Sequence, residues 1–249
     1  MIQVIPVRVS GNVRPNDDLG SIIIAAIKQN ELEIQNGDIL VVAHKIVSKA
    51  EGRIVNLADV KPSPKAIKMA KEHGKDSRIM ELMLRESAKI LRAKKGIIVS
   101  ETKHGLVCAN AGVDQSNVQG NAALLLPADP DKSASKIQYI IKKKTGKEIA
   151  FVIADTFGRP FREGQTNVAI GVAGISPIKS YIGLRDMYGR KLRVSEIAVA
   201  DEIASAAELV MGKAEGVPVA IIRGYKFEKA AKSSAKSLQR PRKHDLFRQ

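Results

Sequence analysis

Short apolar runs rich in β-branched residues recur along the chain, and stretches with helical periodicity separate them. These runs have the composition of buried strands. They lie at residues 3–9, 38–42, 96–100, 106–109, 149–154 and 217–222. A chain of 249 residues can form one large domain or two closely joined lobes. We therefore predict an α+β fold in which mixed sheets and helices build two interleaved lobes.

The segments between these runs predict the helices. We expect helices over residues 18–29, 77–94, 133–146 and 195–211. Asp17 or Asp18 is suited to cap the first helix, Ser133 to cap the third, and Gly146 to end it. An apolar stripe that continues to Leu91 supports the length of the second helix.

Two polar segments differ from simple connections. Residues 110–120 and 155–174 carry many polar side chains and glycines, and loops fixed to strand ends commonly hold functional residues. The stretch 230–249 combines low hydrophobicity with many Lys, Ser and Arg residues, so we expect it to be mobile or helical only when bound. We divide the chain into a main unit, 1–227, and a basic tail, 228–249.

The formal net charge of +15 suits a polyanionic partner, which can be a nucleotide triphosphate, a phosphodiester coenzyme or a nucleic acid. Aromatic residues make up only 4% of the chain and Trp is absent, which argues against a protein that stacks on bases. Charge alone leaves an enzyme and a nucleic-acid-binding protein both open.

Cys108 is the only cysteine, so the chain forms no intramolecular disulfide and no thiolate cage for a metal. We interpret Cys108 as a small buried hydrophobe and expect the protein in the reducing cytoplasm. Residues 1–6 lack the pattern of a signal peptide, and the longest apolar runs are too short to span a bilayer. We therefore expect no membrane segment.

Common nucleotide and hydrolase motifs are absent from the sequence. It contains no G-x-x-x-x-G-K-[ST] phosphate loop and no G-x-G-x-x-G fingerprint, and it also lacks H-E-x-x-H, C-x-x-C and G-x-S-x-G. The histidines show no spacing typical of zinc sites, and we interpret each as a surface or ordinary polar residue. Phosphate chemistry would therefore require an unfamiliar cradle with oxygen ligands for a hard metal ion.

The strongest local signal is the segment 155–167, which directly follows an apolar strand. Asp155 would project a carboxylate from the end of this strand, and Thr156 adds a hydroxyl oxygen of the kind that Mg²⁺ and Mn²⁺ accept. Arg159 and Arg162 can bind phosphate or carboxylate groups in bidentate fashion. A simple Asp-Thr turn with solvated arginines is the alternative.

A second carboxylate lies in a similar setting. Asp114 follows the predicted strand 106–109, and Asn117 could bond a base or a ribose. A lone Asp in a loop is more often a turn residue, but two at separate strand-to-loop junctions begin to resemble a metal site. Lys49 could meet a phosphate, although a solvated lysine is the simpler interpretation in a chain with 41 Lys and Arg residues. The turn 212–218 can wrap a nucleotide with its amides or merely end a helix.

Together these segments resemble the coenzyme F420-0:L-glutamate ligases, the γ-glutamyl ligases of deazaflavin coenzyme biosynthesis. The resemblance covers about residues 1–227, which would be the catalytic unit, and it rests on several motifs in the same order. They are PNDDL at 15–19, VSKAEG at 47–52, LRES at 84–87, and the segments 104–117, 155–167, 216–218 and 223–224. A series of motifs in order is more specific than any single motif.

The resemblance implies a GTP site and a site for Mn²⁺ or Mg²⁺, with K⁺ assisting. Asp114 and Asp155 would hold one metal ion, and Thr156 would help to hold a second. The GTP site would be lined by Ser10, Gly11, Asn12, Val13, His44, Lys45, Lys49, Asn117, Met211, Gly212, Lys213, Ala214, Glu215, Gly216, Val217 and Pro218. The family often places Glu or Gln in the last of these segments as a ligand of the second metal. This chain has Lys213 at the matching place, so either Glu215 would substitute for that ligand or the second metal would bind weakly.

By the same resemblance, the protein would be a ligase that uses GTP to join L-glutamate to the carboxylate of coenzyme F420-0 through an acyl phosphate. It would then add γ-linked glutamates. Arg159, Arg162 and Lys49 are our candidates for positioning the transferred phosphoryl group. A homodimer with its site near a subunit or lobe interface is also implied. A ligase with another acceptor, a basic nucleic-acid-binding protein and a non-catalytic GTP-binding regulator are the alternatives.

Overall fold

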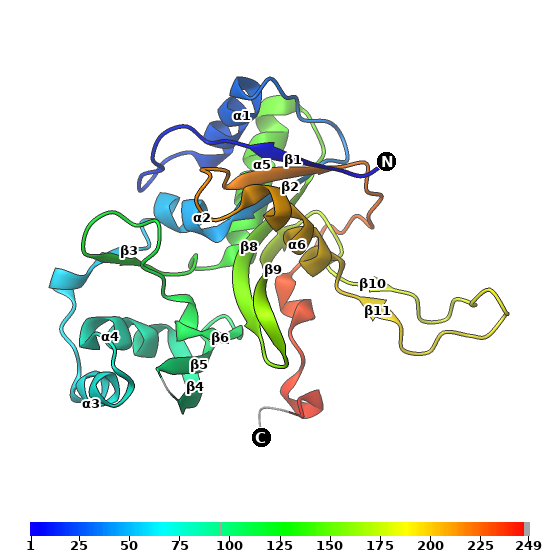
Figure 1. Ribbon diagram of the computed structural model, residues 1–249. Helices are drawn as coiled ribbons and strands as arrows, with labels where there is room; N and C mark the ends of the chain where they lie inside the picture. Colours follow the sequence, from blue (N-terminus) through cyan, green and yellow to red (C-terminus); the bar gives the residue numbers. More distant parts are fainter. Residues whose placement is uncertain (95, 247–249) are drawn as a thin grey trace.

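A mixed five-stranded sheet forms the centre of the fold (Figure 1). The computed structural model describes residues 1–94 and 96–246. The strand order is β1-β12-β2-β8-β9, with the bounds β1 Gln3–Val7, β12 Val219–Arg223, β2 Ile39–Ala43, β8 Ala150–Arg159 and β9 Arg162–Ala173. Strands β2 and β8 pair in parallel, and the other neighbours pair antiparallel. Strand β1, the first in the chain, therefore lies beside β12, the last strand of this sheet in chain order.

Helices cover both faces of this sheet. The bounds of these helices are α1 Leu19–Gln29, α5 Pro130–Thr145 and α6 Val199–Met211. Leu40 and Val42 of β2 join a core with α1 and α5, while Ile39 and Val41 join the opposite core with α6. Because both faces are buried, the central strands are continuous hydrophobic runs, and this made them visible in the sequence.

A smaller lobe with its own core lies between α2 and α5 in the chain. Helix α2, His44–Ala50, packs in the core of the main lobe and leads into the smaller one. The elements of the smaller lobe are β3 Ile54–Asn56, η1 Leu57–Asp59, α3 Pro64–His73, α4 Ser77–Glu86, β4 Ser87–Lys94, β5 Ile97–Thr102, β6 Val107–Ala109, η2 Asn110–Gly112 and β7 Ala122–Leu124. Strands β4, β5 and β6 form a three-stranded sheet, and β3 pairs with β7. The chain leaves the main lobe and returns to it, which confirms the predicted α+β fold of interleaved lobes.

The predicted helix 77–94 is wrong in its second half. Helix α4 ends at Glu86, and β4 begins at Ser87 and pairs antiparallel with β5. Ser87 has an extended backbone (φ −87°, ψ 134°), and its Oγ donates to the carbonyl of Met83. The apolar residues that follow fit the periodicity of a helix as well as that of a strand, and pairing with the neighbouring strand β5 decides in favour of the strand.

The predicted polar loop 155–174 is also wrong, because these residues form most of the long β8–β9 hairpin. Thr156 pairs with Asn167 across this hairpin. Strand β2 ends opposite Ala154, so the hairpin continues past the edge of its parallel neighbour. The polarity of the segment reflects this extension beyond the sheet rather than an irregular backbone.

Local capping explains the start of α1 and both ends of α5. The Asp18 side chain caps α1, and Gly146 ends α5 in the left-handed conformation, as predicted. Asp129 rather than Ser133 caps α5, and α6 starts at Val199 rather than at 195, so these two starts were predicted wrongly.

In the described ranges, every helix is too short or too polar to cross a membrane.

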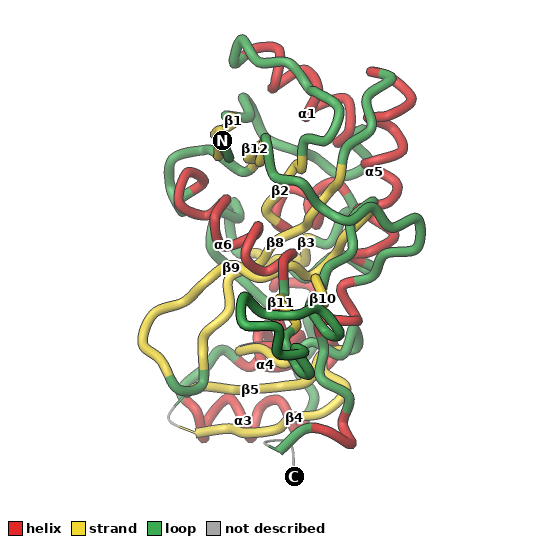
Figure 2. Tube along the Cα trace, turned by 90° about the vertical axis from the view of Figure 1, so that its right-hand side faces the viewer, coloured by secondary structure: helices red, strands yellow, loops and turns green. Residues whose placement is uncertain are grey.

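A narrow arm projects from the body between β9 and α6 (Figure 1, Figure 2). It begins and ends with the paired strands β10, Lys179–Ser180, and β11, Glu196–Ile197. Met187, Tyr188 and Val194 in the arm are 89%, 83% and 86% exposed. The arm therefore presents apolar side chains that this single chain does not cover.

The C-terminal segment, expected to be mobile or helical only when bound, contacts the body as far as Arg242. It contains the short helical turns η3, Ala235–Leu238, and η4, Arg242–His244. Asp131 accepts hydrogen bonds from Ser234 Oγ and from the N–H of Ala235. Arg242 lies 3.0 Å from the carboxylate of Glu101. Residues 247–249 of the predicted tail lie outside the described residues.

Candidate active site

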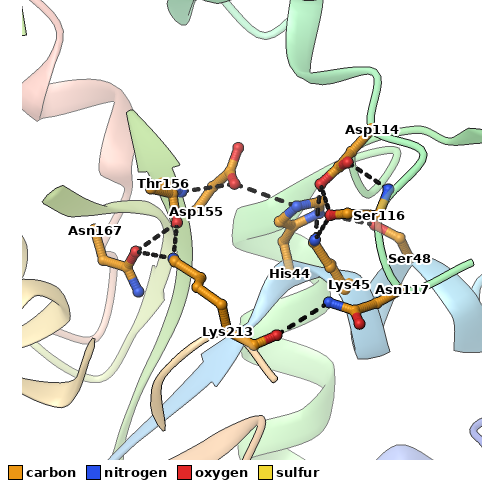
Figure 3. Close-up of polar contacts among 10 residues, drawn as sticks. All are labelled: His44, Lys45, Ser48, Asp114, Ser116, Asn117, Asp155, Thr156, Asn167 and Lys213. Carbon is orange, nitrogen blue, oxygen red and sulfur yellow. Dashed lines mark hydrogen bonds and ion pairs between the residues drawn. The ribbon is translucent and has the colours of Figure 1, made fainter. Parts of the chain in front are cut away.

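A cavity of about 520 Å³ opens at the carboxyl end of β2, where its partner β8 continues past the sheet. The loop that carries Asp114 faces this strand end from the other side (Figure 3). The predicted residues that line the cavity are Gly11, Asn12, Val13, His44, Lys45, Lys49, Asp114, Asn117, Asp155, Thr156, Met211, Gly212, Lys213, Ala214, Gly216, Val217 and Pro218. The fold thus brings together segments that are far apart in sequence.

Asp155 follows the last residue of β8 that pairs with β2. Its Oδ1 lies 3.3 Å from Nε2 of His44 and accepts a 2.7 Å hydrogen bond from the N–H of Thr156. Burial opposes ionisation, but the His44 ring and the Thr156 amide outweigh it and lower the pKa of the Asp155 carboxyl. His44 is itself buried, and its Nδ1 lies 3.4 Å from Ser48 Oγ. Asp155 is therefore held as a carboxylate in the cavity wall.

Asp114 supplies the second carboxylate of the cavity. Its Oδ2 lies 2.7 Å from Nζ of Lys45, and its Oδ1 accepts a 2.7 Å hydrogen bond from the N–H of Ser116. Burial would raise the pKa of Asp114, but Lys45 and Ser116 outweigh it and hold this pKa below its usual value. A pairing between Asp114 and Leu124 of β7 fixes the backbone. The smaller lobe thus delivers this carboxylate to the end of the main sheet.

The two carboxylates and their neighbours suit a hard divalent metal ion. The charge of Asp114 opposes ionisation of Asp155, so the two groups share one electrostatic site. The Thr156 hydroxyl and the Asn167 amide oxygen add neutral oxygen donors beside them. Among the residues that the structure describes, no three His, Cys, Asp or Glu side chains group into a metal cage. Mg²⁺ and Mn²⁺ fit such a site, since they bind through one or two carboxylates and keep positions for water and phosphate.

Basic side chains and a turn that contains glycines line the rest of the cavity. Lys45 and Lys49 lie one turn apart on α2 and both reach the wall. Partial burial, with a smaller effect from the charge of Lys45, lowers the pKa of Lys49. Gly212 ends α6 at φ 56° and ψ −161°, a conformation that glycine adopts readily. The N–H of Val9 donates to the carbonyl of Gly216, so the turn after α6 and the loop after β1 lie side by side.

The cavity lacks four of the predicted site residues. Arg159 and Arg162 lie at the far end of the β8–β9 hairpin, where the Arg159 guanidinium donates to the backbone carbonyl of Glu163 at the start of β9. Glu215 turns its carboxylate back onto the N–H of Ala214, and Ser10 lies outside the wall. The structure brings together the residues predicted for the metal and all but two of those predicted for GTP, and it leaves the two arginines apart from them.

Sequence reasoning missed the polar wall residues Ser116, Gln165 and Asn167. Asn167 is 6% exposed, and its Oδ1 accepts a 2.7 Å hydrogen bond from Thr156 Oγ1. This pairing becomes visible only when the segment after Asp155 is recognised as a hairpin, because Asn167 then lies directly opposite Thr156. Cys108 is buried as predicted, and burial raises the pKa of its thiol to about 12.

Residues 9–224 match the family model described as F420-0:Gamma-glutamyl ligase. The chain belongs to this family. The matched range contains the whole cavity wall, from Val9 to Pro218. Membership in the F420-0:gamma-glutamyl ligase family confirms the resemblance that the ordered motifs indicated.

Similar proteins extend over nearly the whole chain. A protein named coenzyme F420:L-glutamate ligase from Methanothermobacter thermautotrophicus is 51% identical over 238 residues, which cover 95% of this chain and 94% of that protein. The protein of the same name from Methanopyrus kandleri is 42% identical and covers 99% and 98% of the two chains. The one from Methanocaldococcus jannaschii is 44% identical and covers 86% of each. The similarity to this family therefore includes both lobes.

Proposed function

We propose that this member of the F420-0:gamma-glutamyl ligase family uses GTP to join L-glutamate to the carboxylate of coenzyme F420-0, through an acyl phosphate. Further glutamates are then added through γ-linkages. The observation that supports this most is the meeting of Asp114 and Asp155 in one cavity beside the lysines of α2. Family membership points to the type of product, and the cavity offers the groups that phosphoryl transfer requires.

Activation by a phosphoryl group follows from the chemistry of the acceptor. A free carboxylate is a poor acyl donor at neutral pH, because its leaving group would be an oxide. Transfer of the γ-phosphoryl group of GTP to a carboxylate oxygen gives an acyl phosphate and GDP. The glutamate amine then attacks the carbonyl carbon, the bond from carbon to the phosphate oxygen breaks, and the amine loses a proton. Each new amide bond consumes a GTP and releases inorganic phosphate.

The cavity residues have distinct roles in this reaction. Asp114 and Asp155 would hold Mn²⁺ or Mg²⁺, and such an ion neutralises the charge that develops as a phosphoryl group moves. Lys45 and Lys49 would contact phosphate oxygens as point charges, since both line the cavity. Lys45 would exchange its carboxylate partner for a phosphate. Backbone amides of the turn after α6 would surround the remaining phosphate oxygens, and a K⁺ ion would assist.

The functional unit in this proposal is a homodimer in the cytoplasm. The exposed apolar side chains of the β10–β11 arm are typical of a protein interface. Arg159 and Arg162 are remote from the cavity of their own chain, so a partner chain would have to bring them to substrate. Sedimentation of the full chain tests the dimer, and a variant in which a Gly-Ser linker replaces residues 182–194 should sediment as a monomer. A buried thiol such as Cys108 is compatible with a reducing cytoplasm.

The experiment that tests this function is an incubation of the full chain with GTP, Mn²⁺, L-glutamate and coenzyme F420-0, followed by mass spectrometry. We expect products heavier by glutamyl units, and only when both GTP and metal are present. Binding of GTP without any product would instead support the regulator or a ligase with another acceptor. Salt-sensitive binding of DNA or RNA that disappears when residues 232–248 are removed would support the nucleic-acid alternative.

A further inference from the structure

Lys213 is a charged wall residue to which the proposed reaction gives no role. It follows Gly212 in the turn after α6, and its side chain reaches the β8–β9 hairpin (Figure 3). Its Nζ donates a 2.5 Å hydrogen bond to Thr156 Oγ1 and lies 3.5 Å from Asn167 Oδ1. A carboxylate oxygen of Glu208 lies 3.6 Å from the same Nζ. The ammonium group is thus surrounded by oxygen atoms, as a bound cation would be.

The oxygen atoms that meet Lys213 are already oriented as acceptors. Thr156 donates its hydroxyl proton to Asn167 Oδ1 at 2.7 Å, so the lone pairs of Thr156 Oγ1 are left for a cation. Asn167 is buried, and its backbone carbonyl accepts a hydrogen bond from Ser205 Oγ of α6. Because α6 and the hairpin hold these groups in place, the position beside Thr156 is built to receive a positive charge.

This position adjoins the proposed metal site without being the same place. Asp155 and Thr156 are consecutive, and the Thr156 N–H donates to the Asp155 carboxylate while the Thr156 hydroxyl faces Lys213. A second divalent ion beside Thr156 would need a further acidic ligand. In the described turn 211–218, Glu215 is the acidic side chain, and it bonds the N–H of Ala214 instead. Glu208 of α6 lies 3.6 Å from Lys213 Nζ, so its carboxylate is already paired with the ammonium group. The turn therefore offers an ammonium group to Thr156 rather than a carboxylate.

We propose that Lys213 supplies the positive charge beside Thr156, so that this chain binds a single divalent metal ion with its nucleotide, at Asp114 and Asp155. This inference rests on the proposed function, because it assumes a metal–nucleotide complex in the cavity. Lys213 then neutralises phosphate charge on the Thr156 side, where a second metal ion would otherwise do so. It is a binding residue for the nucleotide and keeps a second ion out by charge repulsion.

The test counts Mn²⁺ bound to the full chain with a non-hydrolysable GTP analogue, using electron paramagnetic resonance and elemental analysis after dialysis. We expect one ion per wild-type chain. Lys213→Glu should bind two ions, because it replaces the ammonium with a carboxylate beside Thr156. Lys213→Met removes the charge without adding a ligand, so it should keep one ion and bind the analogue about tenfold more weakly.

Controls separate this inference from loss of fold and from loss of the proposed function. The Lys213 side chain is 59% exposed, so its variants should unfold at the wild-type temperature. Lys65→Glu makes the same charge change on α3, outside the cavity wall, and should keep one ion. Two ions in the wild type, or one in Lys213→Glu, would overturn the role of Lys213 and leave the proposed reaction intact. No ion in the wild type would remove the metal from the proposed function and this inference with it.

Discussion

An ion pair between Asp38 and Arg223 locks β12 to the start of β2, and β2 carries the cavity at its other end. Arg223 Nε and Nη2 lie 2.9 Å and 2.8 Å from the two carboxylate oxygens of Asp38. The Asp38 side chain is 1% exposed and that of Arg223 is 20% exposed. The N–H of Gln35 also donates to Asp38, at 2.8 Å. Hydrogen bonding to Asp38 raises the pKa of Arg223.

We expect Arg223→Met to destabilise the protein strongly, because it keeps the apolar stem of the side chain but removes the partner of a buried carboxylate. Among the described residues, Asp38 would keep one donor, the N–H of Gln35. Breaking a buried ion pair from one side costs about 3–5 kcal/mol of the free energy of unfolding. For a chain of this size, that loss corresponds to a melting temperature lower by about 6–20 °C. Urea and thermal unfolding followed by circular dichroism measure both quantities.

Two controls show whether burial causes the effect. Lys142→Met breaks the ion pair between Lys142 and Glu148, whose side chains are 58% and 53% exposed. It should lower the free energy of unfolding by less than about 1 kcal/mol. The double variant Asp38→Leu/Arg223→Met leaves no unpaired charge, so it should be more stable than Arg223→Met alone. A loss below about 1 kcal/mol in Arg223→Met would refute this reasoning.

Asp155→Asn should abolish metal-dependent turnover while the protein still folds, as circular dichroism would show, and near-normal rates at saturating metal would contradict the role of Asp155. The Cys108 thiol should react with a thiol reagent at pH 8 far more slowly in the folded than in the unfolded protein, because burial raises its pKa to about 12. Hydrogen bonds from Ser21 and Lys144 lower the pKa of Asp18 from 3.8 to about 2. Because the folded pKa is the lower one, the stabilisation is present above pH 3.8 and is lost as the pH falls through about 2. Asp18→Ala should therefore cost about 0.5–2 kcal/mol at neutral pH, and equal losses at pH 7 and pH 2 in urea titrations would count against this N-cap.

The sequence predicted those parts of the fold that a local pattern determines. The central strands were visible because both faces of β2 and β8 are buried, so their residues form uninterrupted apolar runs. Asp18 and Gly146 were visible because capping depends on a few adjacent residues. Strand β4 was missed because its residues fit a helical and a strand periodicity equally well, and only its pairing with β5 makes it a strand.

The candidate site was predictable as a set of segments but not as a geometry. Asp114 and Asp155 both follow strands, which marked them, yet only the fold shows that they share a cavity. Sequence could not show that Lys213 contacts Thr156, because the two residues are 57 positions apart and only the fold brings the turn after α6 to the β8–β9 hairpin. Arg159 and Arg162 looked suitable by chemistry, but the length of the hairpin carries them away from the cavity.

The most direct test of GTP-dependent ligation through an acyl phosphate is to follow oxygen-18 from the coenzyme carboxylate. The full chain would be incubated with labelled coenzyme F420-0, GTP, Mn²⁺ and L-glutamate, and the released phosphate analysed by mass spectrometry. We expect each phosphate formed with the first amide bond to carry an oxygen from that carboxylate, because the bond that breaks lies between the carbonyl carbon and that oxygen. Glutamylated product accompanied by unlabelled phosphate would contradict the acyl phosphate, and the absence of product would contradict the ligase itself.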